Sequence, residues 1–146
     1  MNDLLQDFKT LLDEAPGRLL RFSDAEAEAR PAPDKWSKKE ILGHLIDSVS
    51  NNHQRIVRMQ LQPQLSFPGY RQELWVGTQR YQQEPWRVMI QAWEGFNRHL
   101  LHVIAQIPEE KLANRCSLDG GEPMTLEFLV RDYVRHLRHH LGQIMG

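Results

Sequence analysis

Three of the seven histidines of this chain stand within five positions near its C-terminal end, at His136, His139 and His140. On a helix, His136 and His140 lie one turn apart on the same face, with Cβ atoms roughly 6 Å apart. Two imidazoles at this spacing can share one metal ion, as the two histidines of the H-E-x-x-H motif do. His139 falls about 60° away from His136, on the outer side of the helix. The pair therefore forms an incomplete metal site that needs a ligand from another segment.

His44 is the histidine best placed to complete this site. The segment from 37 to 61, which is predicted to be helical, carries a polar stripe along one edge of its apolar face: His44, Ser48, Asn51 and Arg55. Such an edge is typical of a helix that faces a cavity inside a bundle. Three imidazoles from two helices would hold one divalent ion and leave positions open for water or substrate. The alternative third ligands are His53, His99 and His102.

The chemistry of such a site follows from its neutral nitrogen ligands. We expect a divalent transition metal, zinc or nickel first, with iron, manganese or copper as alternatives. The ion would either lower the pKa of a bound water toward neutrality or hold and activate a thiolate. No catalytic base can be assigned, because Leu137 occupies the position at which H-E-x-x-H carries its glutamate.

Five polar residues are candidates for the surroundings of the metal. Asp132, one turn before His136, and Gln143, three residues after His140, are candidate partners that would orient the imidazole rings. The candidates that line the pocket are Ser48, Asn51 and Arg55, and Arg55 could contact an anion.

Composition excludes several classes of protein. The chain has 146 residues and a formal net charge of -1, which argues against a dedicated nucleic-acid binder. Its single cysteine, Cys116, excludes an internal disulfide framework and a cysteine-rich zinc site. No apolar run approaches the roughly 20 residues that span a bilayer, and the first residues lack the features of a signal peptide. We expect one cytoplasmic domain over residues 1–146, without a membrane or nucleic-acid partner.

Four long amphipathic segments predict an all-α fold, with a four-helix bundle as the default. Ser37 and Glu40 form a capping box at the start of the second long helix. Pro16 is expected to kink or interrupt the first helix, because proline removes a backbone donor. Residues 62–83 are irregular and rich in aromatic side chains. No convincing strand pattern is present, although a short hairpin around Cys116 and Leu118 is predicted.

Two segments together resemble the signatures of a known family. Residues 35–47, with His44 near their end, resemble the second-helix signature of the DinB-like, YfiT-like family of metal-dependent hydrolases, and His136-x-x-x-His140-x-x-Gln143 resembles the C-terminal signature. The resemblance covers nearly the whole chain. It implies a bundle with an up-down-down-up course, a homodimer, and a metal held by His44, His136 and His140.

The resemblance also implies two reactions for a small-molecule substrate. The metal would activate water in a hydrolase, or a low-molecular-weight bacterial thiol in an S-transferase. The alternative is a non-catalytic, dimeric helical module that binds a metal or a ligand.

Overall fold

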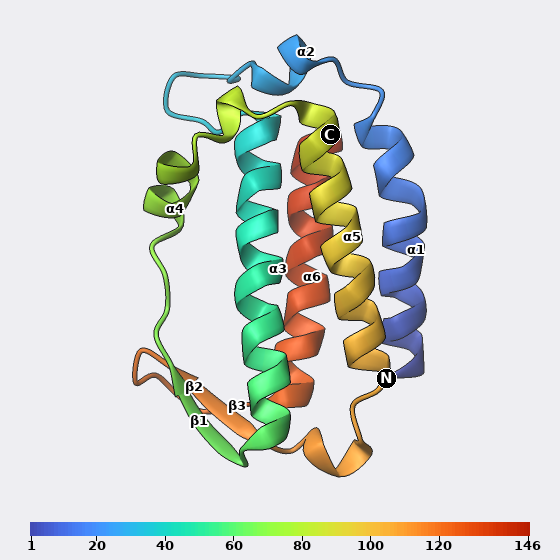
Figure 1. Cartoon of the computed structure of the whole chain (residues 1–146), viewed down its shortest axis with the longest axis vertical. Helices are drawn as coiled ribbons and strands as arrows, with labels where there is room; N and C mark the ends of the chain where they lie inside the picture. The colour runs from blue at the N-terminus through green and yellow to red at the C-terminus, as the bar shows by residue number, and fades with distance from the viewer.

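Four long helices lie side by side around a shared apolar core (Figure 1). A computed structural model describes all residues, 1–146. The helices are α1 (Asn2–Leu19), α2 (Asp24–Glu28), α3 (Lys38–Leu61), α4 (Gln72–Gln79), α5 (Trp86–Ala105) and α6 (Leu126–Met145). The strands are β1 (Gln64–Phe67), β2 (Arg115–Leu118) and β3 (Met124–Thr125), and two short 3-10 turns span Tyr81–Gln83 and Glu109–Lys111. None of the helices is both long enough and apolar enough to cross a membrane.

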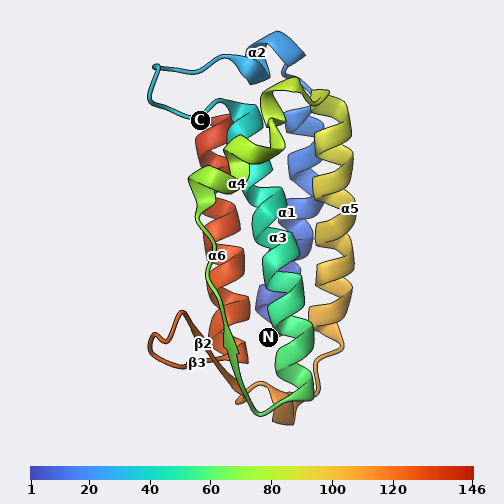
Figure 2. The same ribbon diagram turned by 60° about the vertical axis from the view of Figure 1, so that its left-hand side comes forward.

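The course of the bundle is up-down-down-up, as predicted. In Figure 1, α1 and α6 run upward while α3 and α5 run downward, and α3 packs against both α5 and α6. Because α3 and α5 are parallel neighbours, the chain must return along the bundle between them. Residues 62–85 make this return and carry α4 along the outside of α3 (Figure 2). This crossover becomes one wall of the candidate site.

The ends of the long helices are set by local hydrogen bonds that the sequence predicts. The Ser37 hydroxyl accepts a hydrogen bond from Glu40 N, and the Glu40 carboxylate accepts one from Ser37 N, which completes the capping box. The Thr125 hydroxyl accepts a hydrogen bond from Phe128 N at the start of α6. These caps fix where each helix begins and thereby which residues face the core.

The predicted interruption at Pro16 is wrong, because α1 continues through it to Leu19. A proline at this position leaves the carbonyl of Leu12, four residues earlier, without its helical donor. Arg98 of α5 supplies the missing donor, with its guanidinium 3.0 Å from Leu12 O. A contact between helices therefore repairs the local defect on which the prediction rested.

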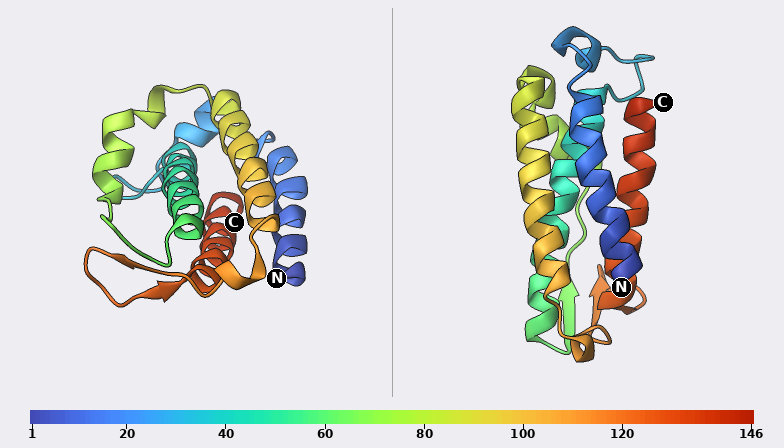
Figure 3. Two further views of the ribbon diagram at one scale, coloured as in Figure 1. Left: turned by 60° about the horizontal axis from the view of Figure 1, so that its bottom comes forward. Right: turned by 90° about the vertical axis from the view of Figure 1, so that its right-hand side faces the viewer.

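A small three-stranded sheet closes one end of the bundle (Figure 3). β2 pairs antiparallel with β3, which confirms the predicted hairpin around Cys116 and Leu118. β1 pairs parallel with β2, with Leu65 opposite Cys116, although no strand was predicted there. A four-residue strand with half of its side chains exposed carries too little alternation to be recognised in a sequence. The sheet ties the start of the crossover to the segment before α6.

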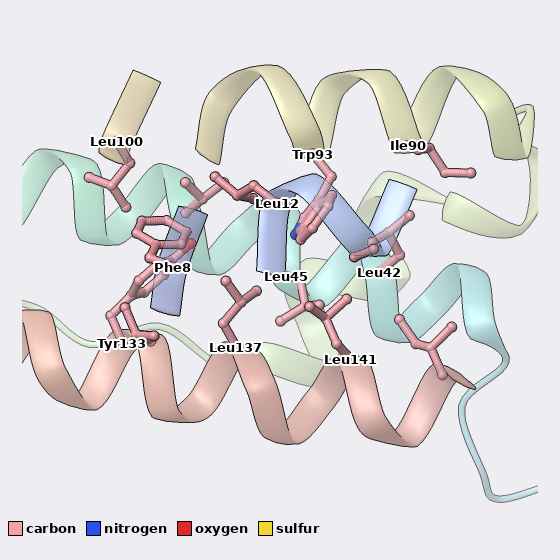
Figure 4. Close-up of a cluster of buried hydrophobic side chains, with 14 of the residues drawn as sticks. Phe8, Leu12, Leu42, Leu45, Ile90, Trp93, Leu100, Tyr133, Leu137 and Leu141 are labelled. Atoms are coloured by element: carbon pink, nitrogen blue, oxygen red, sulfur yellow. The ribbon is translucent and has the colours of Figure 1, made fainter. Parts of the chain in front are cut away.

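The core is built from all four long helices (Figure 4). Apolar side chains from each of these helices meet at the centre of the bundle. The aromatic rings of Phe8 and Tyr133 pack edge to face there, with centroids 6.0 Å apart. The buried contributors drawn there include Leu12, Leu42, Leu45, Trp93, Leu100, Leu137 and Leu141. Burial at helical spacing on every helix holds α3 and α6 in a fixed register, which the site requires.

Candidate metal centre

A hydrogen bond joins the start of α3 to the end of α6. Lys38 Nζ donates a hydrogen bond of 2.6 Å to the carbonyl of Ile144 near the end of α6. Lys39, only 1% exposed, pairs with Asp24 and Glu28 at 3.0 Å each. The Lys39 ion pairs hold the start of α3 to α2. Because α3 and α6 are antiparallel, the Lys38 hydrogen bond brings the second turn of α3 against the last turns of α6.

The structure brings His44, His136 and His140 together at this contact. One ligand nitrogen of each lies within 4.8 Å of the others. His136 Nε2 and His140 Nε2 are 3.0 Å apart, and the His44 ring centroid is 4.9 Å from that of His140. Two nitrogens that bind one ion at about 2.0–2.1 Å are roughly 3–3.4 Å apart. The pair on α6 already has this spacing, which is also that of a hydrogen bond between the two rings, and a His44 nitrogen lies within 4.8 Å of both.

His44 provides the test of whether a metal fits these residues. Its side chain is 1% exposed, and neither ring nitrogen has a hydrogen-bond partner within the protein. A buried polar group without a partner costs about 1–3 kcal/mol. The nearest rings are those of Trp36, with centroids 5.4 Å apart, and of the two histidines on α6. The residues present fit a metal ion, because coordination would give a His44 nitrogen the partner that the fold does not supply.

Burial keeps all three imidazoles neutral at physiological pH. Burial, helped by the nearby His140 and His136, lowers the pKa of His44 to about 4. Burial also lowers the pKa of His136, against the opposing charge of Asp132. The pKa of His140 is lowered by burial too, and its hydrogen bond to Gln143 opposes that effect. The neutral imidazole is the form that binds metals, so the site is prepared for an ion.

The two candidate orienting residues behave differently. Gln143 Oε1 lies 2.8 Å from His140 Nδ1, so this nitrogen donates a hydrogen bond and leaves Nε2 free to bind a metal. Asp132 forms an ion pair with Arg135 and acts on His136 through its charge alone. The sequence placed both residues near the site, but only Gln143 holds a ring directly.

A cavity of about 310 Å³ begins at His136 and lies between α3, α6, the crossover and the β2–β3 hairpin. His136 lines it together with three of the predicted residues, Ser48, Arg55 and Asp132. Asn51 does not line it, and its side-chain amide donates a hydrogen bond to the carbonyl of Asp47. The residues that the sequence analysis missed include Asn52, Tyr70, Asp119 and Tyr133.

These omissions have identifiable reasons. Asn51 and Asn52 differ by about 100° around α3, and the polar stripe alone does not say which side α6 covers. Tyr70 belongs to the crossover, whose path along α3 is set by tertiary contacts. The cluster of aromatic residues between 62 and 83 was the only signal for it.

The other histidines lie apart from this centre. His53 and His99 face each other across α3 and α5, with ring centroids 5.3 Å apart, and His102 stacks on His99. His53 is nine residues after His44, which is roughly 13 Å along the helix axis. The alternative third ligands therefore form a separate group. His139 is exposed on the outer side of α6, as its helical phase predicts.

Comparison with known proteins agrees with this architecture. The chain belongs to the DinB superfamily, whose family model matches residues 7–144. Its fold is similar to that of YfiT from Bacillus subtilis, which is described as a probable metal-dependent hydrolase with an unusual four-helix bundle topology. The TM-score is 0.83 at 17% sequence identity, and the match covers 96% of this chain and 83% of YfiT.

A second similar structure is YjoA, a DinB-like protein from Bacillus subtilis. Its TM-score is 0.66 at 15% identity, and the match covers 97% of this chain and 86% of YjoA. No protein with a curated description matches this chain. At these identities the two structures establish the fold, and the chemistry must be argued from the residues of this chain.

Proposed function

We propose that this protein is an enzyme that uses one divalent metal ion on His44, His136 and His140 to hydrolyse a small-molecule substrate. The observation that carries the proposal is His44, whose two buried ring nitrogens have no partner and which packs against two half-buried imidazoles. The description of the structurally similar YfiT as a probable metal-dependent hydrolase supports the same class of reaction.

The residues of the chain would prepare the site in three ways. Burial keeps the ligands neutral, as the lowered pKa of each histidine indicates. The hydrogen bond from His140 to Gln143 fixes the ring so that Nε2 faces the other imidazoles. The cavity next to His136 gives a substrate a place to bind that is partly shielded from water. A zinc or nickel ion, when bound, would supply a Lewis acid that lowers the pKa of a coordinated group.

Thiol transfer is the second candidate, and the charge of the ligand set supports it as well as it supports hydrolysis. No carboxylate belongs to the cluster of three histidines, so the centre would keep the full positive charge of the ion. Such a centre stabilises a thiolate as well as it activates water. A low-molecular-weight thiol would then attack an electrophilic substrate, with the cavity holding one of the two reactants.

Elemental analysis of protein purified without an affinity tag tests the metal. We expect one equivalent of a divalent transition metal per chain, or stoichiometric uptake when zinc or nickel is added at neutral pH. His136→Ala should abolish uptake, whereas His139→Ala should not, because His139 is exposed on the outer side of α6. Equal loss in both variants, or no metal in the wild type, would refute the proposal.

Turnover then separates the two reactions. Loss of an ester or amide substrate without added thiol would indicate hydrolysis, and loss of an electrophile only in the presence of thiol would indicate transfer. A protein that binds the metal but turns over neither class would be a binding module. Assembly as a homodimer remains part of the proposal, and sedimentation velocity of the metal-loaded protein would test it.

A further inference from the structure

Arg55 is the one buried basic residue of the chain that forms no ion pair. Its side chain is 7% exposed, and no carboxylate lies within ion-pair distance of the guanidinium. Asp119 acts on it only through its charge, which raises the pKa of Arg55 and partly offsets the effect of burial. The other buried basic residue, Lys39, pairs with Asp24 and Glu28. A buried charge without a partner is strongly destabilising, so folded proteins rarely keep one without a function.

The guanidinium faces the cavity that begins at His136. Arg55 lines this cavity, and its Cζ lies 5.9 Å from the centre of the Tyr70 ring on the crossover wall. Arg55 lies eleven residues after His44 on α3, which is roughly 16 Å along the helix axis. Burial lowers the pKa of Arg55 from its ordinary value, and the guanidinium nevertheless stays charged at neutral pH.

We propose that Arg55 binds the carboxylate of an anionic substrate whose reacting group lies at the three histidines. This inference rests on the proposed function and names the class of its substrate. A guanidinium presents a planar fork of donors that matches a carboxylate with two parallel hydrogen bonds. A metal at one end of the cavity and Arg55 farther along it would hold such a molecule at two points and orient it.

The neighbouring charges favour a carboxylate over a phosphate. Asp119 and Asp132 line the same cavity, and both are engaged elsewhere: Asp119 accepts a hydrogen bond from Gly69 N, and Asp132 pairs with Arg135. Their charges still act on a ligand. A single guanidinium balances the one charge of a carboxylate, whereas the two charges of a phosphate would be repelled by these aspartates.

The test compares butyrate with butyramide, which has nearly the same shape and no charge. Protein labelled with ¹⁵N at the arginine Nε is titrated with each compound, in metal-free and zinc-loaded form, and the Arg55 resonance is assigned by its loss in Arg55→Met. We expect butyrate to shift this resonance with a dissociation constant at least about tenfold lower than that of butyramide, as two hydrogen bonds to charged groups imply. Arg55→Met should remove the difference.

Arg58→Met is the matched control. Arg58 lies on the same helix but is exposed, with Nε 3.2 Å from Gln54 Oε1. Its loss should leave butyrate binding unchanged. Thermal unfolding separates ligand binding from a structural role, because removal of an unpaired buried charge should leave the melting temperature of Arg55→Met equal to or above that of the wild type.

Three results would overturn the inference. These are equal binding of butyrate and butyramide by the wild type, retention of the difference in Arg55→Met, and a melting temperature of that variant well below that of the wild type. Tighter binding of inorganic phosphate than of butyrate would overturn the choice of a carboxylate. Metal uptake is measured on the same samples. Loss of metal binding with butyrate binding intact would refute the proposed function and still support the anion site.

Discussion

The replacement His44→Leu should raise the stability of the metal-free protein and abolish its stabilisation by metal. The two side chains have similar volumes, and His44 lies in an almost fully buried position. In the metal-free protein both ring nitrogens lack partners, so their removal should add about 1–3 kcal/mol to the free energy of unfolding. For a protein of this size that corresponds to a rise of about 3–10 °C in melting temperature.

The metal should reverse this order. At a free concentration one hundred times its dissociation constant, a bound ion stabilises the wild type by about 2.7 kcal/mol. That corresponds to about 8–10 °C for a domain of this size. The His44→Leu variant keeps only His136 and His140, so its melting temperature should change little. At this concentration the wild type should be about as stable as the variant, and at one thousand times the dissociation constant, where the ion adds about 4.1 kcal/mol, it should be more stable.

The assay is thermal unfolding followed by circular dichroism, with a chelator and with zinc or nickel. His102→Ala is the control, because His102 is exposed on α5 and belongs to the separate group of histidines. Its curves should match those of the wild type under both conditions. A metal-free His44→Leu protein that melts several degrees below the wild type would show that the imidazole has partners. Equal stabilisation of both proteins by metal would show that His44 is no ligand.

Three further predictions concern the same end of the bundle. The metal-free protein should lose stability as pH falls from 6.5 to about 4, because His44 in the unfolded chain is protonated at a higher pH than His44 in the folded protein. The free energy of unfolding should fall by up to about 3 kcal/mol. Urea unfolding at several pH values would measure this fall, which should be smaller in His44→Leu. Gly43→Ala should cost about 1–3 kcal/mol, because its Cβ would lie 2.1 Å from the Tyr81 ring, and denaturant unfolding would measure it. Gln143→Ala should weaken metal affinity by about 10–100-fold without unfolding the chain, because the His140 ring loses the hydrogen bond that orients it. Titration calorimetry with the metal would measure the change in affinity.

The helices could be predicted because their signals are local. The capping residues Ser37 and Thr125 stand next to apolar residues at helical spacing, and the structure contains both caps. The errors arise where a distant residue changes the local balance. Pro16 stays within α1 because Arg98 donates a hydrogen bond to the carbonyl that the proline leaves free. β1 exists because β2, about fifty residues later, offers it a partner.

The three histidines could be selected from the sequence because each lies on the inner edge of a helix with a strong apolar face. Their mutual distances depend on the register of α3 against α6, which the core and the Lys38 contact determine. The identity of the wall facing them could not be predicted. Tyr70 reaches the cavity because the crossover follows α3, and the aromatic residues of 62–83 do not show which of them would face the cavity.

The polar groups that the fold leaves without partners point to one place. Trp93 Nε1 and Asp47 Oδ2 also lack partners, but Trp93 lies among apolar side chains in the core, and the other oxygen of Asp47 accepts hydrogen bonds from Tyr81 and Gln79. His44 faces two imidazoles, and Arg55 faces the cavity that starts at one of them. Burying each group without a partner lowers the stability of the free protein. A metal cation would bind a His44 nitrogen, and an anion would pair with the Arg55 guanidinium. Such an ion would give His44 its partner, and a substrate that meets the ion and carries a carboxylate would give Arg55 its partner.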